Sequence, residues 1–147
     1  MFTHQVTEAI EIDSDADRVW AVLTDPDASW NPFIRSWDGS FTAGNKITVK
    51  LGLPDGRPFT FHPSVLVVEP GHALEWLGRT AGVPFLFDGH HRFLIEPMGE
   101  GRVRFTQSES FRGILVPFLG GLFRKTGRGF RLMNEALRDR ARRGAAA

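Results

Sequence analysis

The sequence contains no cysteine and no tyrosine among its 147 residues. The lack of cysteine excludes disulfides, thiolate metal sites and cysteine nucleophiles. No apolar run approaches the ~20 residues that a membrane span needs, and the first residues lack the basic and then apolar layout of a signal peptide. The formal net charge is only +1, so no overall field favours nucleic acid or an acidic partner. We therefore expect a soluble cytoplasmic protein that binds no nucleic acid and has no stable membrane anchor.

The aromatic residues are almost all apolar: 13 are Phe and 4 are Trp. Phe has no polar group, so most of this aromatic surface cannot form hydrogen bonds. The rings either fill a core or line a cavity, and composition leaves both interpretations open. No linker, composition break or internal repeat divides the chain. This predicts one domain over residues 1–147 that buries roughly 68–70% of its unfolded surface.

Turn residues divide the chain into strand-like and helix-like segments. The strand-like segments are 3–12, 34–42, 46–53, 59–69, 72–78, 85–96 and 102–111. Helical spacing over about 14–24, stopped by Asp25-Pro26, predicts a short helix, and 27–30 a second short helix or turn. A basic amphipathic stretch from about Phe118 to Arg142 predicts a long final helix. We predict an α+β fold: an antiparallel sheet of six or seven strands, two short helices near the N-terminus and a long C-terminal helix.

The closing hairpin and the final helix predict where a cavity lies. Both carry many apolar residues, so we expect the helix to cross the concave face of the sheet. A curved sheet that grips a helix leaves space between the two, and we expect function in that space.

Two hairpins allow a register to be predicted from the length of their turns. With Pro70-Gly71 as a two-residue turn, Val67 faces Leu74 and Val65 faces Trp76 on one side of the sheet.

The last hairpin has its loop at residues 97–101. This loop places His91 opposite Gln107, with Glu109 as a diagonal neighbour. Alternate residues of a strand share one face, and the apolar faces of the two strands must meet. His91, Gln107 and Glu109 are therefore the polar groups that this hairpin contributes to the inner face.

Several groups of residues, taken in chain order, resemble one known superfamily. They are Ile12-Asp13 with Arg18-Val19-Trp20-Ala21-Val22-Leu23-Thr24-Asp25 and Trp30-Asn31-Pro32-Phe33; Val68-Glu69-Pro70-Gly71 with Leu74-Glu75-Trp76; and Gly89-His90-His91-Arg92-Phe93-Leu94-Ile95-Glu96-Pro97, Thr106-Gln107-Ser108-Glu109 and Met133-Asn134-Glu135-Ala136-Leu137-Arg138. The ordered set is similar to the polyketide-cyclase/START-like superfamily, also called SRPBCC, over essentially the whole chain. The resemblance implies a helix-grip fold, in which a curved sheet wraps around the C-terminal helix, and a deep apolar pocket for lipids, sterols, hormones or polyketides. It brings no universal catalytic motif.

The shared facing of these positions predicts a mostly apolar pocket between the sheet and the last helix. The residues expected to bind a ligand are Val65, Trp76, Phe87, His91, Phe93, Phe105, Gln107, Glu109, Phe130 and Met133. A Glu that faces apolar space should have a raised pKa, and a His could share its proton. Such a pair could perform acid–base chemistry on an enolisable carbonyl, so His91 and Glu109 are the candidate catalytic residues. The same pair could instead orient a ligand or order the core.

No metal or cofactor site is expected. His90 and His91 are adjacent strand residues that point to opposite faces, so they cannot bind one ion together. No dinucleotide-binding or P-loop pattern occurs, and no Gly-x-Ser-x-Gly nucleophile motif. The basic residues of the last helix are expected to form a solvated face, because its apolar stripe should be buried in the fold.

Three functions from different classes remain. The first is binding of a small hydrophobic or aromatic ligand, such as a lipid, sterol or polyketide-like molecule. The second is a polyketide cyclase or dehydratase-like enzyme that uses His91 and Glu109 as acid and base. The third is a protein-interaction domain with a vestigial cavity. The sequence makes no prediction of the oligomeric state.

Overall fold

The computed structural model describes residues 2–54 and 56–145. The strands in these residues are β1 Thr3–Ile12, β2 Ile34–Asp38, β3 Thr48–Leu51, β4 Phe59–Phe61, β5 Ser64–Glu69, β6 Ala73–Arg79, β7 Asp88–Pro97 and β8 Val103–Arg112. The helices are α1 Ala16–Leu23 and α2 Gly120–Ala145, with short 3₁₀ turns η1 Thr80–Gly82 and η2 Val116–Phe118. The α+β class and the long C-terminal helix predicted from the sequence are confirmed.

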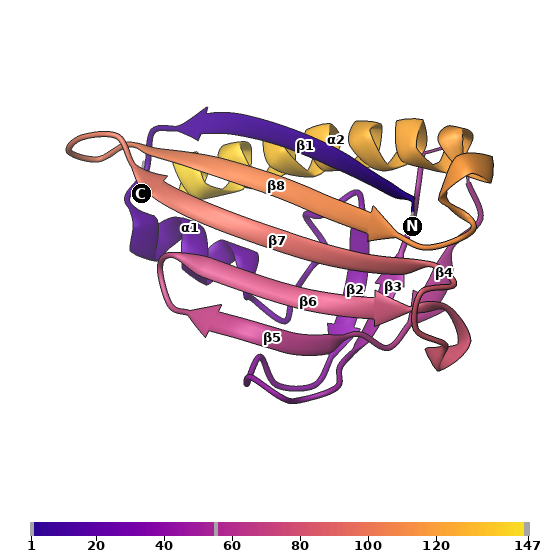
Figure 1. Cartoon of the computed structure of the whole chain (residues 1–147). Coiled ribbons are helices and arrows are strands. Elements are labelled where there is room, and N and C mark those ends of the chain that lie inside the picture. The colour runs from indigo at the N-terminus through magenta and orange to yellow at the C-terminus, as the bar shows by residue number, and fades with distance from the viewer. Residues whose placement is uncertain (1, 55, 146–147) are drawn as a thin grey trace.

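The strands form two antiparallel sheets (Figure 1). The large sheet has five strands in the order β1-β8-β7-β6-β5, and the small sheet has three in the order β2-β3-β4. An isolated bridge between Lys46 and Ser64 joins the two sheets. Figure 1 shows α2 and the small sheet behind the large sheet, and buried residues from all three form one apolar cluster. This is the helix-grip arrangement that the sequence predicts.

The predicted strand at 59–69 divides into β4 and β5, which belong to different sheets. Pro63 lies between them and has no backbone N–H for a ladder. Its carbonyl still accepts a hydrogen bond from Ile47 N–H, and Val65 N–H donates to the Asn45 carbonyl, so the chain stays next to the segment before β3 while its other edge begins to pair with β6. The structure thus has eight strands in two sheets over the described residues, where the sequence predicted six or seven in one.

The second short helix predicted near the N-terminus does not form. In this segment the side-chain oxygens of Asp25, Asp27 and Asn31 each accept a hydrogen bond from the backbone N–H two residues ahead. Such local bonds satisfy the backbone in turns and compete with a helix. Residues 27 and 28 accordingly have no regular structure, and residues 29 and 30 form a turn, which was the other structure predicted for this segment.

The β5–β6 hairpin has the predicted pair Val65 and Trp76, but Val67 lies opposite Glu75 and not opposite Leu74. A bulge between Val65 and Val67 inserts one extra residue into β5. A bulge changes the count on one strand only. The predicted register is therefore wrong between the turn and the bulge, and it is right on the far side of the bulge.

The β7–β8 hairpin is shifted by two residues from the predicted register. Pro97 pairs with Val103, so the loop runs over residues 98–102. His91 consequently lies opposite Glu109, and Gln107 becomes its diagonal neighbour. A shift of two residues leaves every side chain on its predicted face, whereas a shift of one would have reversed them.

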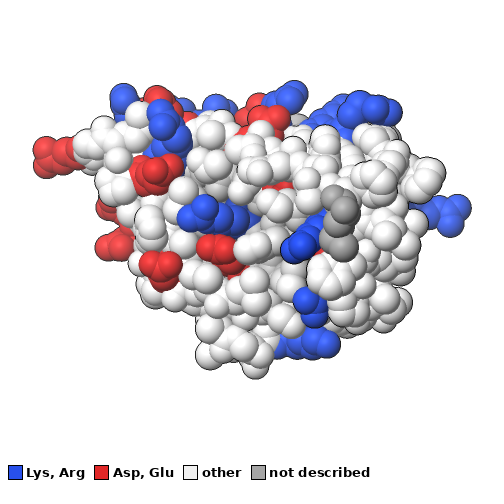
Figure 2. Space-filling view, in the orientation of Figure 1, with Lys and Arg blue, Asp and Glu red and all other residues white. Residues whose placement is uncertain are grey.

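Helix α2 packs through one apolar stripe. Its residues Phe123, Phe130, Met133, Leu137 and Ala141 recur at helical spacing and are at most 6% exposed. This stripe is the amphipathic pattern that the sequence predicts. On the opposite, outer face of the large sheet, Figure 2 shows side chains of both signs near one another. No helix in the described part of the chain combines the length and apolarity needed to cross a membrane.

Candidate functional site

A cavity of about 660 Å³ lies between the small sheet, one end of the large sheet and the first half of α2. Leu51 on β3 and Phe61 on β4 form part of one wall, and Phe87 and Phe111 line the large-sheet side. Leu122 faces it from α2. Rings and aliphatic groups from β3, β4, β8, α2 and the segment just before β7 thus converge on one mostly apolar space.

The floor of the cavity is formed where two glycines replace side chains. Gly78 on β6 pairs with Gly89 on β7, and both line the cavity. A Cβ atom at Gly89 would lie 2.6 Å from Glu109 Oε1, and one at Gly78 would lie 3.3 Å from a Phe61 ring carbon. Glycine inside a strand often marks such a close approach. The pair therefore makes room for the Glu109 carboxyl and for the Phe61 ring.

Glu109 is the acidic residue that lines this cavity. Its side chain is 16% exposed, and its carboxyl has no hydrogen bond to another described residue. Burial raises the pKa of Glu109 to about 8. At neutral pH the carboxyl is therefore protonated, and it presents one O–H donor and one carbonyl acceptor to the cavity.

His91 lies opposite Glu109 on the neighbouring strand, and three aromatic rings surround its imidazole. The ring centroids of Phe93, Phe130 and Trp76 lie 4.3, 4.9 and 5.3 Å from that of His91. Burial lowers the pKa of His91 to about 3, so its imidazole is neutral at neutral pH. The 3.8 Å between His91 Nδ1 and Glu109 Oε2 is too long for a hydrogen bond. At neutral pH this is a contact between two uncharged groups, not an ion pair.

A line of buried polar side chains continues from His91 toward α2. His91 Nε2 lies 2.9 Å from Gln107 Oε1, and Gln107 Nε2 donates to Asn134 Oδ1 at 2.9 Å. Asn134 Nδ2 donates in turn to the backbone carbonyl of Glu8 at 3.2 Å. Gln107 and Asn134 are at most 2% exposed, so each of these bonds compensates the cost of burying a polar group.

Of the ten residues predicted to bind a ligand, Phe87 and Glu109 line this cavity. The other eight lie in the packed interior instead; they are Val65, Trp76, His91, Phe93, Phe105, Gln107, Phe130 and Met133, each at most 3% exposed. Facing was predicted correctly, because all ten lie on the inner side. The difference arises along the strands: rings fill one end of the inner face, and the cavity occupies the end where Gly78 and Gly89 leave space.

Residues of the small sheet that line the cavity were not predicted. Leu51, Phe59 and Phe61 belong to strands whose place over the large sheet depends on the chain crossing at Pro63. The signal that could have located the floor is the occurrence of Gly78 and Gly89 inside strand-like segments.

The two adjacent histidines face opposite sides of β7, as predicted. His90 Nε2 contacts Glu75 Oε1 at 2.7 Å, whereas His91 bonds to Gln107 in the interior. Over residues 2–54 and 56–145, no three His, Cys, Asp or Glu side chains are grouped to hold a metal ion.

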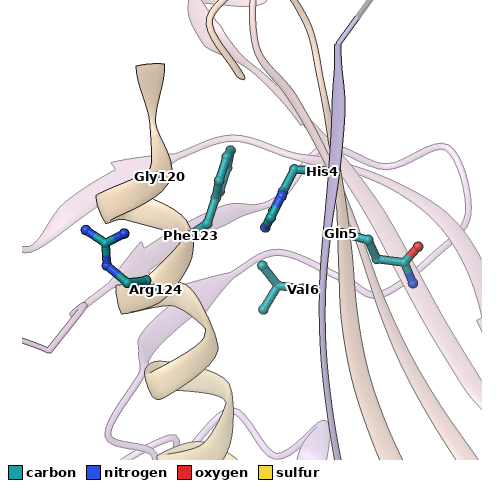
Figure 3. A pocket seen from close by; sticks show the side chains of 6 residues that line it. All are labelled: His4, Gln5, Val6, Gly120, Phe123 and Arg124. Atoms are coloured by element: carbon teal, nitrogen blue, oxygen red, sulfur yellow. The ribbon is translucent and has the colours of Figure 1, made fainter. Parts of the chain in front are cut away.

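A second, shallower space of about 390 Å³ lies between β1 and the start of α2. His4 and Phe123 stack there with their ring centroids 4.3 Å apart, and Figure 3 shows Gln5 pointing away to the far side of β1. Arg124 and Gly120 complete the space from α2. It contains no carboxylate and no buried polar network, so the larger cavity is the better candidate site.

The sequence matches, over residues 3–145, the protein family described as polyketide cyclase/dehydrase and lipid transport. A search of curated proteins found no match. Among solved structures, the Zhui aromatase/cyclase from Streptomyces sp. R1128 has a TM-score of 0.76 and 14% sequence identity, over 97% of this chain and 95% of that one. A START superfamily protein from Mycobacterium smegmatis has a TM-score of 0.72 and 17% identity, over 95% and 98%.

Norcoclaurine synthase from Thalictrum flavum, in complex with dopamine and hydroxybenzaldehyde, has a TM-score of 0.67 and 14% identity, over 94% of this chain and 86% of that one. At identities this low, the likeness shows a common fold. The match of the family model over residues 3–145 confirms the superfamily that the sequence resembles.

Proposed function

Because the chain belongs to the polyketide cyclase/dehydrase and lipid transport family, we propose that it binds a small hydrophobic or aromatic ligand in the cavity of about 660 Å³. Ligand sites are typically concave, mostly apolar spaces of ~300–1,000 Å³ with a few polar groups that fix orientation. The observation that carries the proposal is this mostly apolar space with the largely buried Glu109 carboxyl at its floor. A lipid, a sterol or a polyketide-like molecule fits this description.

Glu109 and Phe87 are the two sequence-predicted residues that we propose to touch the ligand. Glu109 would accept a hydrogen bond from a ligand hydroxyl or donate one to a ligand carbonyl, and Phe87 would pack against a ring or chain. The eight other predicted residues would not touch the ligand. They would hold together the sheet and the helix that shape the cavity. An aromatic ligand is supported by two similar structures, an aromatase/cyclase and a synthase that holds dopamine and hydroxybenzaldehyde.

An enzyme is the second candidate, and a specific observation favours it. Glu109 is a neutral acid at the cavity, and the neutral imidazole of His91 lies 3.8 Å from it. A polyketide cyclase or dehydratase-like reaction could use His91 and Glu109 as an acid/base pair, in which Glu109 exchanges the proton with the substrate and His91 acts through Glu109. The protein-interaction alternative, with a vestigial cavity, is less well supported, because a space of about 660 Å³ is open.

Two tryptophan substitutions on α2 test the site. Leu122 lines the cavity, so Leu122→Trp should fill it. Leu132 is 39% exposed on the same helix and does not line the cavity, so Leu132→Trp is the matched control. With 1-anilinonaphthalene-8-sulfonate as the probe, we expect Leu122→Trp to weaken binding at least tenfold and Leu132→Trp to leave it unchanged. Equal binding by both variants would place the probe elsewhere.

A melting-temperature screen with fatty acids, sterols and aromatic polyketides then identifies the class of ligand, since a ligand that binds only the folded state raises the melting temperature. No increase with any of the three classes would contradict the proposed binding. The proposal includes one domain over residues 1–147, a cytoplasmic location and no cofactor. Cell fractionation and mass spectrometry of the intact native protein test the last two.

A further inference from the structure

The orientation of each amide in the buried polar line is set by the backbone carbonyl of Glu8. A carbonyl oxygen only accepts hydrogen bonds. The Asn134 atom that lies 3.2 Å from it must therefore be Nδ2, which turns Asn134 Oδ1 toward Gln107. Oδ1 is also an acceptor, so Gln107 must present Nε2 to it. Gln107 Oε1 is thereby left facing His91.

This orientation fixes the position of the proton on His91. Gln107 Oε1 only accepts, so His91 Nε2, 2.9 Å away, must carry the hydrogen. A neutral imidazole has one N–H. Nδ1 is therefore unprotonated, and it is the nitrogen that faces Glu109 Oε2.

An unprotonated nitrogen next to a carboxyl favours the acid form of that carboxyl. The lone pair of Nδ1 can accept a hydrogen bond from Glu109 O–H, after a small approach or through one water, but it can give nothing to a carboxylate. If the proton were on Nδ1, His91 would donate to Glu109 and stabilise the carboxylate. The tautomer of His91 thus determines which form of Glu109 is favoured.

We propose that Gln107 and Asn134 are positioning residues of the cavity, which hold His91 in its Nε2–H tautomer and so keep Glu109 in its acid form. Asn134 lies on α2 and does not line the cavity, yet it sets the charge that a ligand meets there. This role of Gln107 and Asn134 deepens the proposed function. Only its consequence for ligand binding rests on that function. With the acid form maintained, the cavity receives uncharged ligands; with a carboxylate, it favours cationic ones.

Other charged and titratable groups also face the cavity that Glu109 lines. Lys46 and His62 line the cavity from the small-sheet side, and Arg79 lines it from the end of β6. Arg79 also pairs with Asp88 at 3.8 Å. Val6 on β1 lies opposite Glu109, and α2 contributes the uncharged Leu122 and Thr126.

The wild-type protein tests the tautomer directly. In protein labelled with ¹⁵N, multiple-bond ¹H–¹⁵N correlations distinguish the two neutral tautomers of a histidine ring, and the spectrum of His91→Phe assigns the signals. We expect His91 at pH 7 to be neutral with its proton on Nε2. A proton on Nδ1, or on both nitrogens, would overturn the proposal without any variant or ligand.

Substitutions on α2 then test the coupling. Asn134→Leu removes the group that orients Gln107, so both tautomers of His91 should appear. The midpoint of Glu109 titration, followed by the ¹³C shift of its carboxyl, should fall by about one pH unit. Asn134→Asp keeps an acceptor for Gln107 Nε2 and should retain the wild-type tautomer.

Met133→Leu is the matched control, because Met133 is the adjacent buried residue of α2 and has no part in the polar line. It should leave both the tautomer and the titration unchanged. A changed tautomer with an unchanged Glu109 titration would refute the coupling. If Asn134→Leu does not fold, Asn134→Asp and the wild-type spectrum still decide. Absence of probe binding with the expected tautomer would refute the proposed function alone.

Discussion

Glu109 should make the protein less stable as the pH rises, and Glu109→Gln should remove this loss. Burial raises the pKa of Glu109 from 4.5 to about 8. Between these values the folded protein binds a proton that the unfolded chain has released, so stability falls with increasing pH. The contribution is fully present below pH 4.5 and is lost as the pH rises through 8. The slope has an upper limit of about 1.4 kcal/mol per pH unit.

The size of the loss follows from the same shift. A rise of the pKa from 4.5 to about 8 corresponds to at most roughly 5 kcal/mol. The side chain is 16% exposed, and water in the cavity reduces the cost of ionising it. We therefore expect wild type to lose about 2–4 kcal/mol by pH 9 through this group.

His91 acts in the opposite direction at lower pH. Its pKa is lowered from 6.5 to about 3, so between these values the unfolded chain binds the additional proton and stability falls as the pH decreases. From pH 4.5 to 6.5 the effects of His91 and Glu109 offset each other. Above pH 6.5 only the effect of Glu109 remains. The two residues together predict a plateau of stability with a decline on its alkaline side.

Urea denaturation at half-unit steps from pH 5 to 9 measures this curve. We expect wild type to decline above pH 6.5 and Glu109→Gln to stay level there, because a glutamine does not ionise. Glu100→Gln, which removes the same charge from an exposed residue of the β7–β8 loop, should follow wild type. Parallel curves for wild type and Glu109→Gln between pH 6.5 and 9 would show that Glu109 titrates normally and refute the argument.

Two further predictions concern α2 and the reaction. Gly129→Ala should destabilise the protein by about 1–3 kcal/mol, because its Cβ would lie 2.5 Å from the Phe33 ring; Gly127→Ala, with 3.4 Å to Val6, should stabilise it by up to about 1 kcal/mol in thermal or urea unfolding. Equal effects of the two would refute the packing argument. Glu109→Gln should change ligand affinity only modestly. A polyketide-like ketone that wild type converts and Glu109→Gln binds equally but does not convert would establish the enzyme instead.

The alternation of side chains allowed the faces of the strands to be predicted from the sequence. Phe105, Gln107, Glu109 and Phe111 are every second residue of β8. The structure places all four on the inner side of the sheet. Facing depends only on the two-residue period of a strand, which local sequence contains. It also survived the error of two residues in the β7–β8 register, since an even shift does not exchange the faces.

The position of the cavity along those strands could not be predicted in the same way. It depends on how far the small sheet reaches over the large one, and that is set by the crossing at Pro63 and by the bulge between Val65 and Val67. It also depends on Gly78 and Gly89 meeting across β6 and β7. A glycine in one strand is visible in the sequence, but its neighbour on the next strand depends on the register.

The polar line from Glu8 to Glu109 is the feature of the fold that core packing explains least. An apolar side chain at Gln107 would need no partner, whereas the amide there needs His91 on one side and Asn134 on the other. Ionisation of Glu109 lowers the stability of the folded protein above pH 6.5, and the buried carboxyl forms no hydrogen bond with another described residue that would offset this loss. Exceptions of this kind to the rules of a well-packed core are expected where a protein functions. The cost is explained if an acid is required at the floor of the cavity, and the polar line then favours the same acid form of Glu109 that burial favours.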